Sequence, residues 1–254
     1  GAVNLSTLAG GKDFTCGITS AGGVLCWGTG NPTGATSFAV AVAGLSNVTA
    51  LGLGDDHACA LISDGTIRCW GDNTSGQLGD GSNTQSSTPV TVSGISDASA
   101  IAAGSRFNCA VRTGGSVNCW GDNTSGQLGD GSQTASNLPV TTTGLSDATQ
   151  LDAGWEHVCA RTRSGHMYCW GSNSGYQLGV VNPRPTATTP QQVRHNLDGA
   201  VLAGVAQVSL GGGTTCFLRN DGVTLTCWSA NRFGSCGTGA SGNNVSTFNN
   251  FTLP

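Results

Sequence analysis

Eleven cysteines give this chain its most specific chemical signal. Ten of them form five pairs, in which a first cysteine stands ten or eleven residues before a Cys-Trp dipeptide. Paired cysteines can coordinate zinc or oxidise to a disulfide. Structural zinc sites place two to four residues between cysteines, a spacing that this sequence lacks. The pattern therefore predicts five disulfides: Cys16–Cys26, Cys59–Cys69, Cys109–Cys119, Cys159–Cys169 and Cys216–Cys227.

The residues between two paired cysteines read as a β-hairpin. Ser63-Asp64-Gly65 is a three-residue turn with glycine at the left-handed position, which places Cys59 opposite Cys69. This pair falls on a non-hydrogen-bonded site, where Cα atoms approach to about 4.5 Å and a disulfide can form. The last pair has one extra residue, so its hairpin needs a longer turn or a bulge. Disulfides persist in oxidising compartments, so we expect a secreted or cell-surface protein.

The cysteine pairs belong to a repeat that covers the chain. Successive Cys-Trp tryptophans lie 43, 50, 50 and 58 residues apart. Short alternating runs bounded by turn residues indicate strands, and each unit has the length of a four-stranded propeller blade. The prediction is an all-β, five-bladed β-propeller, one domain over residues 1–254, with one disulfide-stapled hairpin in each blade. A glycine precedes each first cysteine by five positions: Gly11, Gly54, Gly104, Gly154 and Gly211.

The two ends of the chain also fit this repeat. Residues 250–254 followed by residues 1–6 resemble the internal passage from residues 89–92 to residues 96–99. We therefore expect strands from both termini to complete one blade and close the ring. Closure would remove the free sheet edge of an open arc.

The composition excludes several classes of partner. Only 9% of the residues are charged, the net charge is −4, and Lys12 is the single lysine. Nucleic-acid binding requires clustered lysine and arginine, so we expect none. No apolar run approaches the roughly 18 to 20 residues of a membrane span. A polar surface of low charge suits contacts with sugars or with other proteins.

The short loops after the repeat glycines are the candidate ligand site, because equivalent loops of the blades would share one rim. Trp155 stands where the other units have Lys12, Asp55, Ser105 and Gly212. An exposed tryptophan can bind a sugar face or a protein, or it can pack on a neighbouring loop. The candidate ligand-binding residues are Trp155, Glu156, Asp13, Asp56 and Arg106. His57 and His157 fit a structural hydrogen bond better than catalysis.

Other motifs carry weaker predictions. Asp72 and Asp80 are ordinary turn residues and do not fit a calcium-loop spacing, so we expect no metal and no cofactor. Cys236, the odd cysteine, fits a buried small apolar residue or an intermolecular disulfide. The sequence has carboxylates on the rim but no nucleophile elbow and no Ser-His-Asp order, so we expect the protein not to be an enzyme. Candidate glycosylation sequons occur at Asn4, Asn47, Asn73, Asn123, Asn244 and Asn250.

The pattern Cys-Ala-Leu…Gly…Cys-Trp-Gly…Asn-x-x-Gly-Gln-Leu-Gly resembles the regulator-of-chromosome-condensation repeat. The matching residues run from Trp70 to Gly79 and from Trp120 to Gly129. The resemblance implies a β-propeller, and the paired cysteines resemble the secreted bacterial branch of that family. Rings of the family usually have seven blades, so this chain is either a five-bladed ring or part of a longer array. The matching termini favour five.

These observations predict a secreted, non-enzymatic binding or adhesion module. We expect it to recognise a glycan or a cell-surface protein through the rim loops. One alternative is a structural subunit of an extracellular fibre or surface layer, which would assemble with copies of itself. Another is a secreted inhibitor of an enzyme, because a secreted member of the family inhibits β-lactamases through loops that follow the repeat glycine.

Overall fold

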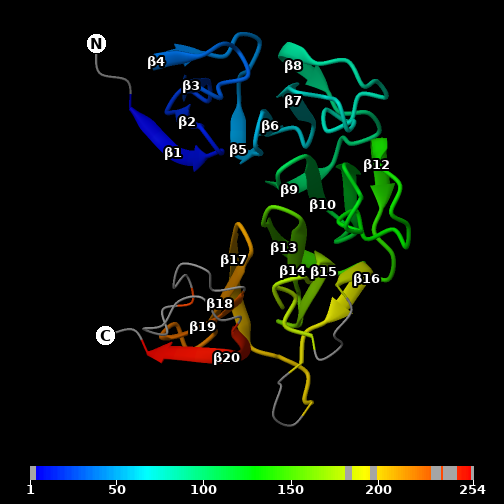
Figure 1. Ribbon diagram of the computed structural model, residues 1–254. Coiled ribbons are helices and arrows are strands. Elements are labelled where there is room, and N and C mark those ends of the chain that lie inside the picture. The colour runs from blue at the N-terminus through cyan, green and yellow to red at the C-terminus, as the bar shows by residue number, and fades with distance from the viewer. Residues whose placement is uncertain (1–3, 181–184, 195–198, 230–235, 237–244, 253–254) are drawn as a thin grey trace. The chain divides into compact units, whose positions relative to one another are not determined.

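The chain forms five antiparallel β-sheets of four strands each (Figure 1). The computed structural model describes residues 4–180, 185–194, 199–229, 236 and 245–252, and no helix occurs among them. Each sheet takes four strands that are consecutive in the sequence, which is the connectivity of a propeller blade. The fold is therefore the predicted all-β, five-bladed β-propeller.

The strand bounds show how regularly the unit repeats. Blade 1 contains β1 (Leu5–Gly10), β2 (Phe14–Thr19), β3 (Val24–Gly28) and β4 (Thr36–Ala41). Blade 2 contains β5 (Val48–Leu53), β6 (His57–Ile62), β7 (Ile67–Gly71) and β8 (Ser86–Thr91). Blade 3 contains β9 (Ala98–Ala103), β10 (Phe107–Arg112), β11 (Val117–Gly121) and β12 (Ser136–Thr141). Blade 4 contains β13 (Ala148–Ala153), β14 (His157–Thr162), β15 (Met167–Ser172) and β16 (Thr186–Gln192). Blade 5 contains β17 (Val205–Gly211), β18 (Thr214–Arg219), β19 (Thr224–Ser229) and β20 (Val245–Thr252).

The central hairpin of each blade carries a disulfide, as the cysteine spacing predicts. All five predicted pairs are joined, with Cα atoms 4.0 to 4.2 Å apart. Cys59 lies directly opposite Cys69, and Gly65 in the turn has a φ of 83°, the left-handed conformation that the turn requires. In blade 5 the extra residue lengthens the turn, and Cys216 still faces Cys227. The disulfide prediction is therefore confirmed.

The prediction about the terminal strands is wrong. Among the described residues, β1 pairs with β2 and begins blade 1, while β20 pairs with β19 and ends blade 5. In the part of the chain that the structure describes, no blade takes strands from both ends. The internal segment that the two ends resemble, residues 89–99, runs from β8 of one blade to β9 of the next. The resemblance therefore corresponds to a connection between two blades and not to strands within one blade.

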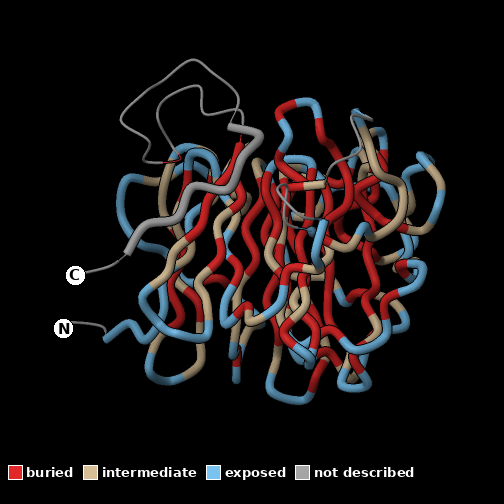
Figure 2. Tube along the Cα trace, turned by 90° about the horizontal axis from the view of Figure 1, so that it is seen from below, coloured by how far each residue is buried: buried red, intermediate tan, exposed pale blue. Residues whose placement is uncertain are grey.

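Apolar side chains fill the spaces between neighbouring blades. One cluster joins blades 1 and 2 through Val24, Val42 and Trp70, and another joins blades 2 and 3 through Leu78 and Trp120. A third joins blades 4 and 5, and its largest members include Met167, Leu202 and Trp228. Figure 2 shows buried residues along the strands and exposed residues at the turns.

The chain divides into two compact units. Unit 1 contains blades 1 and 2 and most of blade 3, over residues 1–113, 118–123 and 134–140. Unit 2 contains blades 4 and 5 with segments 114–117 and 124–133 of blade 3. The single domain over residues 1–254 remains a prediction. Within the described residues, no helix is long and apolar enough to cross a membrane.

Candidate binding site on the blade rim

The rim turns that follow the repeat glycines are built around a buried ring. The His57 ring lies so close to Gly54 that a Cβ on that glycine would stand 2.2 Å from its Cε1 atom. The same construction on Gly154 would bring a Cβ to 2.3 Å from His157 Cε1. These separations are far shorter than van der Waals contact, so only glycine fits. In blades 2 and 4 the repeat glycine therefore has a packing role that the sequence did not reveal.

His57 joins blade 2 to blade 3 in a hydrogen-bond network. Its Nε2 atom lies 3.0 Å from Asn108 Oδ1, so it donates to that amide oxygen. Asn108 Nδ2 donates to the main-chain oxygen of Gln77 at 2.8 Å, and Trp120 Nε1 donates to the same oxygen at 3.0 Å. The network is buried, and His57 therefore holds two blades together, as its predicted structural role requires.

His157 makes the equivalent link between blades 4 and 5. Its Nε2 atom lies 2.9 Å from Thr215 Oγ1, and Thr215 donates in turn to the main-chain oxygen of Gln177 at 2.7 Å. Trp228 Nε1 donates to that oxygen at 2.9 Å. His157 must then carry its proton on Nε2, and its buried Nδ1 has no partner. Burial lowers the pKa of His157 from 6.5 to about 3, which keeps it neutral at physiological pH.

The backbone of each rim turn is held by the next turn within its unit. The N–H of Asp55 donates to the oxygen of Ser105 at 3.0 Å, and the N–H of Trp155 donates to the oxygen of Gly212 at 2.9 Å. A Cβ on Gly11 would stand 2.9 Å from the oxygen of Gly54, so these two turns are in contact as well. The turns therefore form fixed rows whose side chains face solvent.

The candidate ligand-binding residues fall into two groups. Unit 1 places Asp13, Asp56 and Arg106 at the ends of three successive rim turns, and all three are exposed. Unit 2 places Trp155 and Glu156 together in the turn between β13 and β14. One rim shared by all five turns remains a prediction.

Among the described residues of unit 2, Trp155 is the most exposed large hydrophobic residue, with 64% of its surface accessible. Its ring also packs, because a Cβ on Gly212 would stand 3.4 Å from the ring atoms Cε2 and Cζ2. The packing alternative is thus realised in part, and the ligand alternative stays a prediction. One part of the indole rests on the glycine backbone, and the rest is exposed to solvent.

Glu156 lies beside this tryptophan and is also exposed. Ser125 Oγ donates to Glu156 Oε2 at 3.1 Å, and the N–H of Ser172 donates to the main-chain oxygen of Glu156 at 2.8 Å. The carboxylate is therefore oriented by a neighbouring hydroxyl while its second oxygen can accept a further hydrogen bond. An aromatic face beside an oriented acceptor is an arrangement that binds hydroxyl-bearing ligands.

Two polar side chains of β13 tie blade 4 to blade 5 near this site. Gln150 Nε2 donates to the oxygen of Val208 at 3.3 Å, and Asp152 Oδ2 accepts from the N–H of Leu210 at 2.7 Å. Burial raises the pKa of Asp152 above its usual value. Blades 2 and 3 have alanine or glycine at these positions, so the repeat pattern does not indicate this bridge.

Comparison with known proteins identifies the repeat. The description "Regulator of chromosome condensation (RCC1) repeat" matches residues 64–111, 114–161 and 164–218. A second form of the same repeat matches residues 48–77, 98–127 and 148–177. The chain belongs to the RCC1 repeat family. No curated protein sequence matches it.

Three solved structures illustrate the similarity. Yeast RCC1 (Prp20), bound to Kap60, is 18% identical with a TM-score of 0.82, over 98% of this chain and 61% of that one. Human WBSCR16 is 20% identical with a TM-score of 0.86, over 98% of this chain and 67% of that one. The ectodomain of the Physcomitrella patens receptor kinase CR4 is 27% identical with a TM-score of 0.59, over 89% of this chain and 52% of that one. The chain therefore spans about three fifths of yeast RCC1 and half of the CR4 ectodomain.

The RCC1 loop after the Cys-Trp pair is held by its own side chains. Asn73 Nδ2 donates to the oxygens of Ser82 and Thr84, and Asn73 Oδ1 accepts from the N–H of Leu78. Asp80 accepts from the N–H of Ser82. The loop acids therefore serve turn geometry. Among the described residues no three histidine, cysteine or acidic side chains gather as a metal site.

This loop excludes two of the candidate glycosylation sites. Asn73 and Asn123 are fully buried, and each Nδ2 atom that would carry the glycan donates inside the loop. The sequon reading of both is wrong for the folded protein. Asn4 and Asn47 are exposed and stay predictions. Asn244 lies outside the described residues, as does the side chain of Asn250.

Tyr176 is a rim residue that the sequence reading missed. It has a φ of 62°, a left-handed conformation, at the RCC1 position occupied by Gly76 and Gly126. Those glycines lie against the outer strand of the next blade, near Asn137 and Thr188. A tyrosine held in this conformation is strained, and it is 43% exposed in the same blade as Trp155. In the sequence, the replacement of the repeat glycine by tyrosine at this position was the signal that could have identified it.

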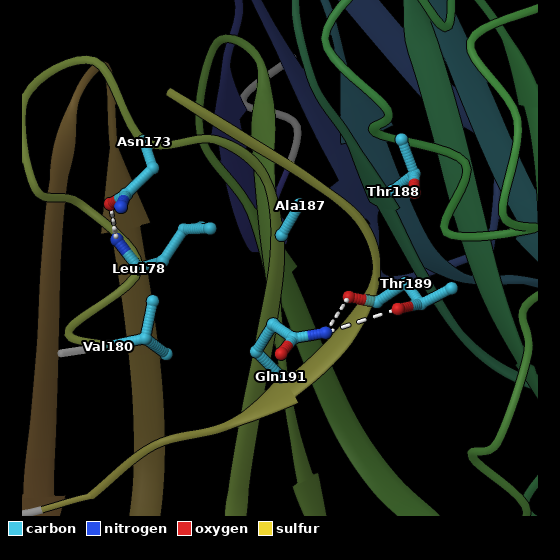
Figure 3. A pocket seen from close by; sticks show the side chains of 7 residues that line it. All are labelled: Asn173, Leu178, Val180, Ala187, Thr188, Thr189 and Gln191. Carbon is cyan, nitrogen blue, oxygen red and sulfur yellow. Dashed lines mark hydrogen bonds between the residues drawn. The ribbon is translucent and has the colours of Figure 1, made fainter. Parts of the chain in front are cut away.

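A small pocket opens on the outer side of blade 4, with a volume of about 120 Å³. Figure 3 shows Leu178 and Val180 on one side of Ala187 and Thr188 and Thr189 on the other, and Gln191 donates hydrogen bonds to the main-chain and side-chain oxygens of Thr189. Val180 stands where blades 2 and 3 have Asp80 and Asp130. None of the predicted site residues lines this pocket.

Cys236 is buried and forms no disulfide. It lies 3.0 Å from Ser229 Oγ, and burial raises the pKa of its thiol. These observations fit the small buried residue of the sequence analysis.

Proposed function

We propose that the chain is an extracellular, non-enzymatic binding module that recognises a glycan through the rim of blade 4. The single observation that carries the proposal is Trp155, seated on Gly212 and still 64% exposed. The Glu156 carboxylate beside it supplies an acceptor for sugar hydroxyls. An aromatic face with an adjacent carboxylate is a recurrent way to bind a sugar ring.

Two observations support an extracellular address. The five disulfides are typical of an oxidising compartment. The CR4 structure, 27% identical to this chain, is the ectodomain of a receptor kinase.

The surroundings of the rim support a role without catalysis. His57 and His157 are the rim residues best suited to proton transfer, and both are buried with lowered pKa values. Their hydrogen bonds hold blades together. The exposed rim is left with Trp155, Glu156 and the side chains of unit 1, which suit binding.

A glycan array with the intact, oxidised protein tests the proposal, followed by calorimetry on the ligands found. We expect Trp155→Ala to weaken binding at least tenfold, because it removes the stacking surface. Phe38→Ala is the matched control, since Phe38 is an exposed aromatic residue on a different blade. An empty array, or equal losses in the two variants, would contradict glycan recognition at Trp155. Binding of a protein ligand that Trp155→Ala abolishes would keep the site and change its ligand.

A further inference from the structure

The rim turn of blade 4 places a fixed carboxylate beside an exposed aromatic ring. Glu156, the only glutamate of the chain, follows Trp155 directly. Ser125 Oγ donates to Glu156 Oε2 at 3.1 Å, and the N–H of Ser125 is itself held by Gln127 Oε1 at 2.8 Å. The main chain of Glu156 is also fixed, because its oxygen accepts from the N–H of Ser172 at 2.8 Å. The second carboxylate oxygen, Oε1, accepts no hydrogen bond from the described residues and is presented to solvent in a set position.

The other carboxylate near this turn is already used by the fold. Asp152 Oδ2 accepts from the N–H of Leu210 at 2.7 Å, and Asp152 Oδ1 accepts from the N–H of Ala153 at 2.8 Å. Both oxygens of Asp152 therefore bind main chain. Glu156 is the carboxylate that can meet a ligand beside Trp155.

The positive charges of unit 2 lie at the other end of its blades. β14 and β16 run away from this rim, and so does β18 of blade 5, which begins beside the turn. The arginines that the structure describes in unit 2 lie in the last residues of these strands or just beyond them: Arg161, Arg163, Arg194 and Arg219. The described part of unit 2 therefore places no arginine or lysine at the rim to neutralise Glu156.

An ammonium group fits this arrangement better than a hydroxyl group does. A cation against an indole is attracted by the negative face of the ring. A cation that donates to a carboxylate adds the attraction between two opposite charges to the hydrogen bond that any donor makes. A hydroxyl group makes the hydrogen bond without either charge term. The net charge of −4 adds a long-range attraction for a cationic ligand.

We propose that Trp155 and Glu156 select a glycan whose sugars carry a protonated amine. The ammonium group lies against the Trp155 indole and donates to Glu156 Oε1. This inference rests on the proposed glycan recognition and adds the chemical group that the ligand must carry.

Three tetrasaccharides with one β-1,4-linked backbone test the inference. They differ only at carbon 2, which carries an ammonium group in glucosamine, an acetamide in N-acetylglucosamine and a hydroxyl group in glucose. Calorimetry with the intact, oxidised protein measures each affinity, at low salt and at a pH where the amine is protonated. We expect the glucosamine oligomer to bind at least tenfold more tightly than the other two, and added salt to reduce this preference. Equal affinities that depend on Trp155 would overturn the inference and leave glycan recognition in place. An absence of binding to all three would overturn the inference, and the glycan array then decides the proposed function separately.

Glu156→Gln tests the charge while keeping the size and shape of the side chain. We expect the preference for the glucosamine oligomer over the glucose oligomer to fall to less than twofold. Asp147→Asn is the matched control, because it removes an exposed carboxylate at the opposite end of the same blade, directly before β13. This control should keep the wild-type preference, and melting curves establish that both variants fold. A preference that survives Glu156→Gln, or that Asp147→Asn reduces equally, contradicts the assignment to Glu156.

Discussion

The rim turns of blades 2 and 4 share a backbone and differ in their exposed side chains. Both begin with a glycine pressed against a histidine ring, and both donate a main-chain N–H to the turn of the next blade. Blade 2 then has a half-buried Asp55 and an exposed Asp56, whereas blade 4 exposes Trp155 and Glu156. The buried positions of the turn maintain the contact between blades, and the other two positions can differ without changing that contact.

Gly154→Ala should have the largest effect on this shared framework. Its Cβ would stand 2.3 Å from His157 Cε1 and 2.4 Å from the oxygen of Gly212. We expect a loss of about 2 to 4 kcal/mol in the free energy of unfolding. Gly211→Ala is the matched control at the same repeat position in blade 5, where no atom lies within 4 Å. Chemical denaturation of both variants measures the difference. Equal effects would show that the ring contact is unimportant.

Acidification should weaken the contact that His157 makes with Thr215. The folded-state pKa is about 3, below the ordinary value of 6.5, so the unfolded chain binds the extra proton first. Stability from this group is complete above pH 6.5 and is lost as the pH falls toward 3. The loss is about 2 kcal/mol between pH 7 and pH 5. His157→Gln should reduce this dependence, and the part that remains is expected from His57, whose pKa burial also lowers. A wild-type stability that is constant from pH 7 to pH 4 would contradict the assignment.

Exchanging the exposed residues should have the smallest effect on stability. Trp155→Asp gives blade 4 the residue of blade 2, and Asp55→Trp makes the reverse change. Because Trp155 is exposed and Asp55 is only half-buried, we expect each unfolding free energy to stay within about 0.5 kcal/mol of the wild type. Thermal melting measures the effect. A much larger loss for Trp155→Asp would mean that its contact with Gly212 is structural.

The sequence predicted what is local along the chain. The position of Cys59 opposite Cys69 follows from the length of one turn, and the blade count follows from the spacing of the Cys-Trp pairs. The partners of His57 and His157 could not be predicted in this way, because Asn108 and Thr215 lie in other blades, 51 and 58 residues away.

Two other features also depend on contacts that a linear motif does not contain. The sequon at Asn73 reads as a glycan acceptor, yet the same asparagine organises the loop through its amide. The similarity of the two ends reads as a shared blade, yet strand pairing places the break between blades. In both cases the residue types allow two interpretations, and the hydrogen-bond partners in the structure distinguish between them.

Measuring stability and ligand binding together on Trp155→Asp tests recognition by the blade 4 turn most directly. We expect a melting temperature close to that of the wild type and binding of an array-identified glycan at least tenfold weaker. Wild-type affinity in this variant would contradict the assignment of recognition to the exposed positions of the blade 4 turn.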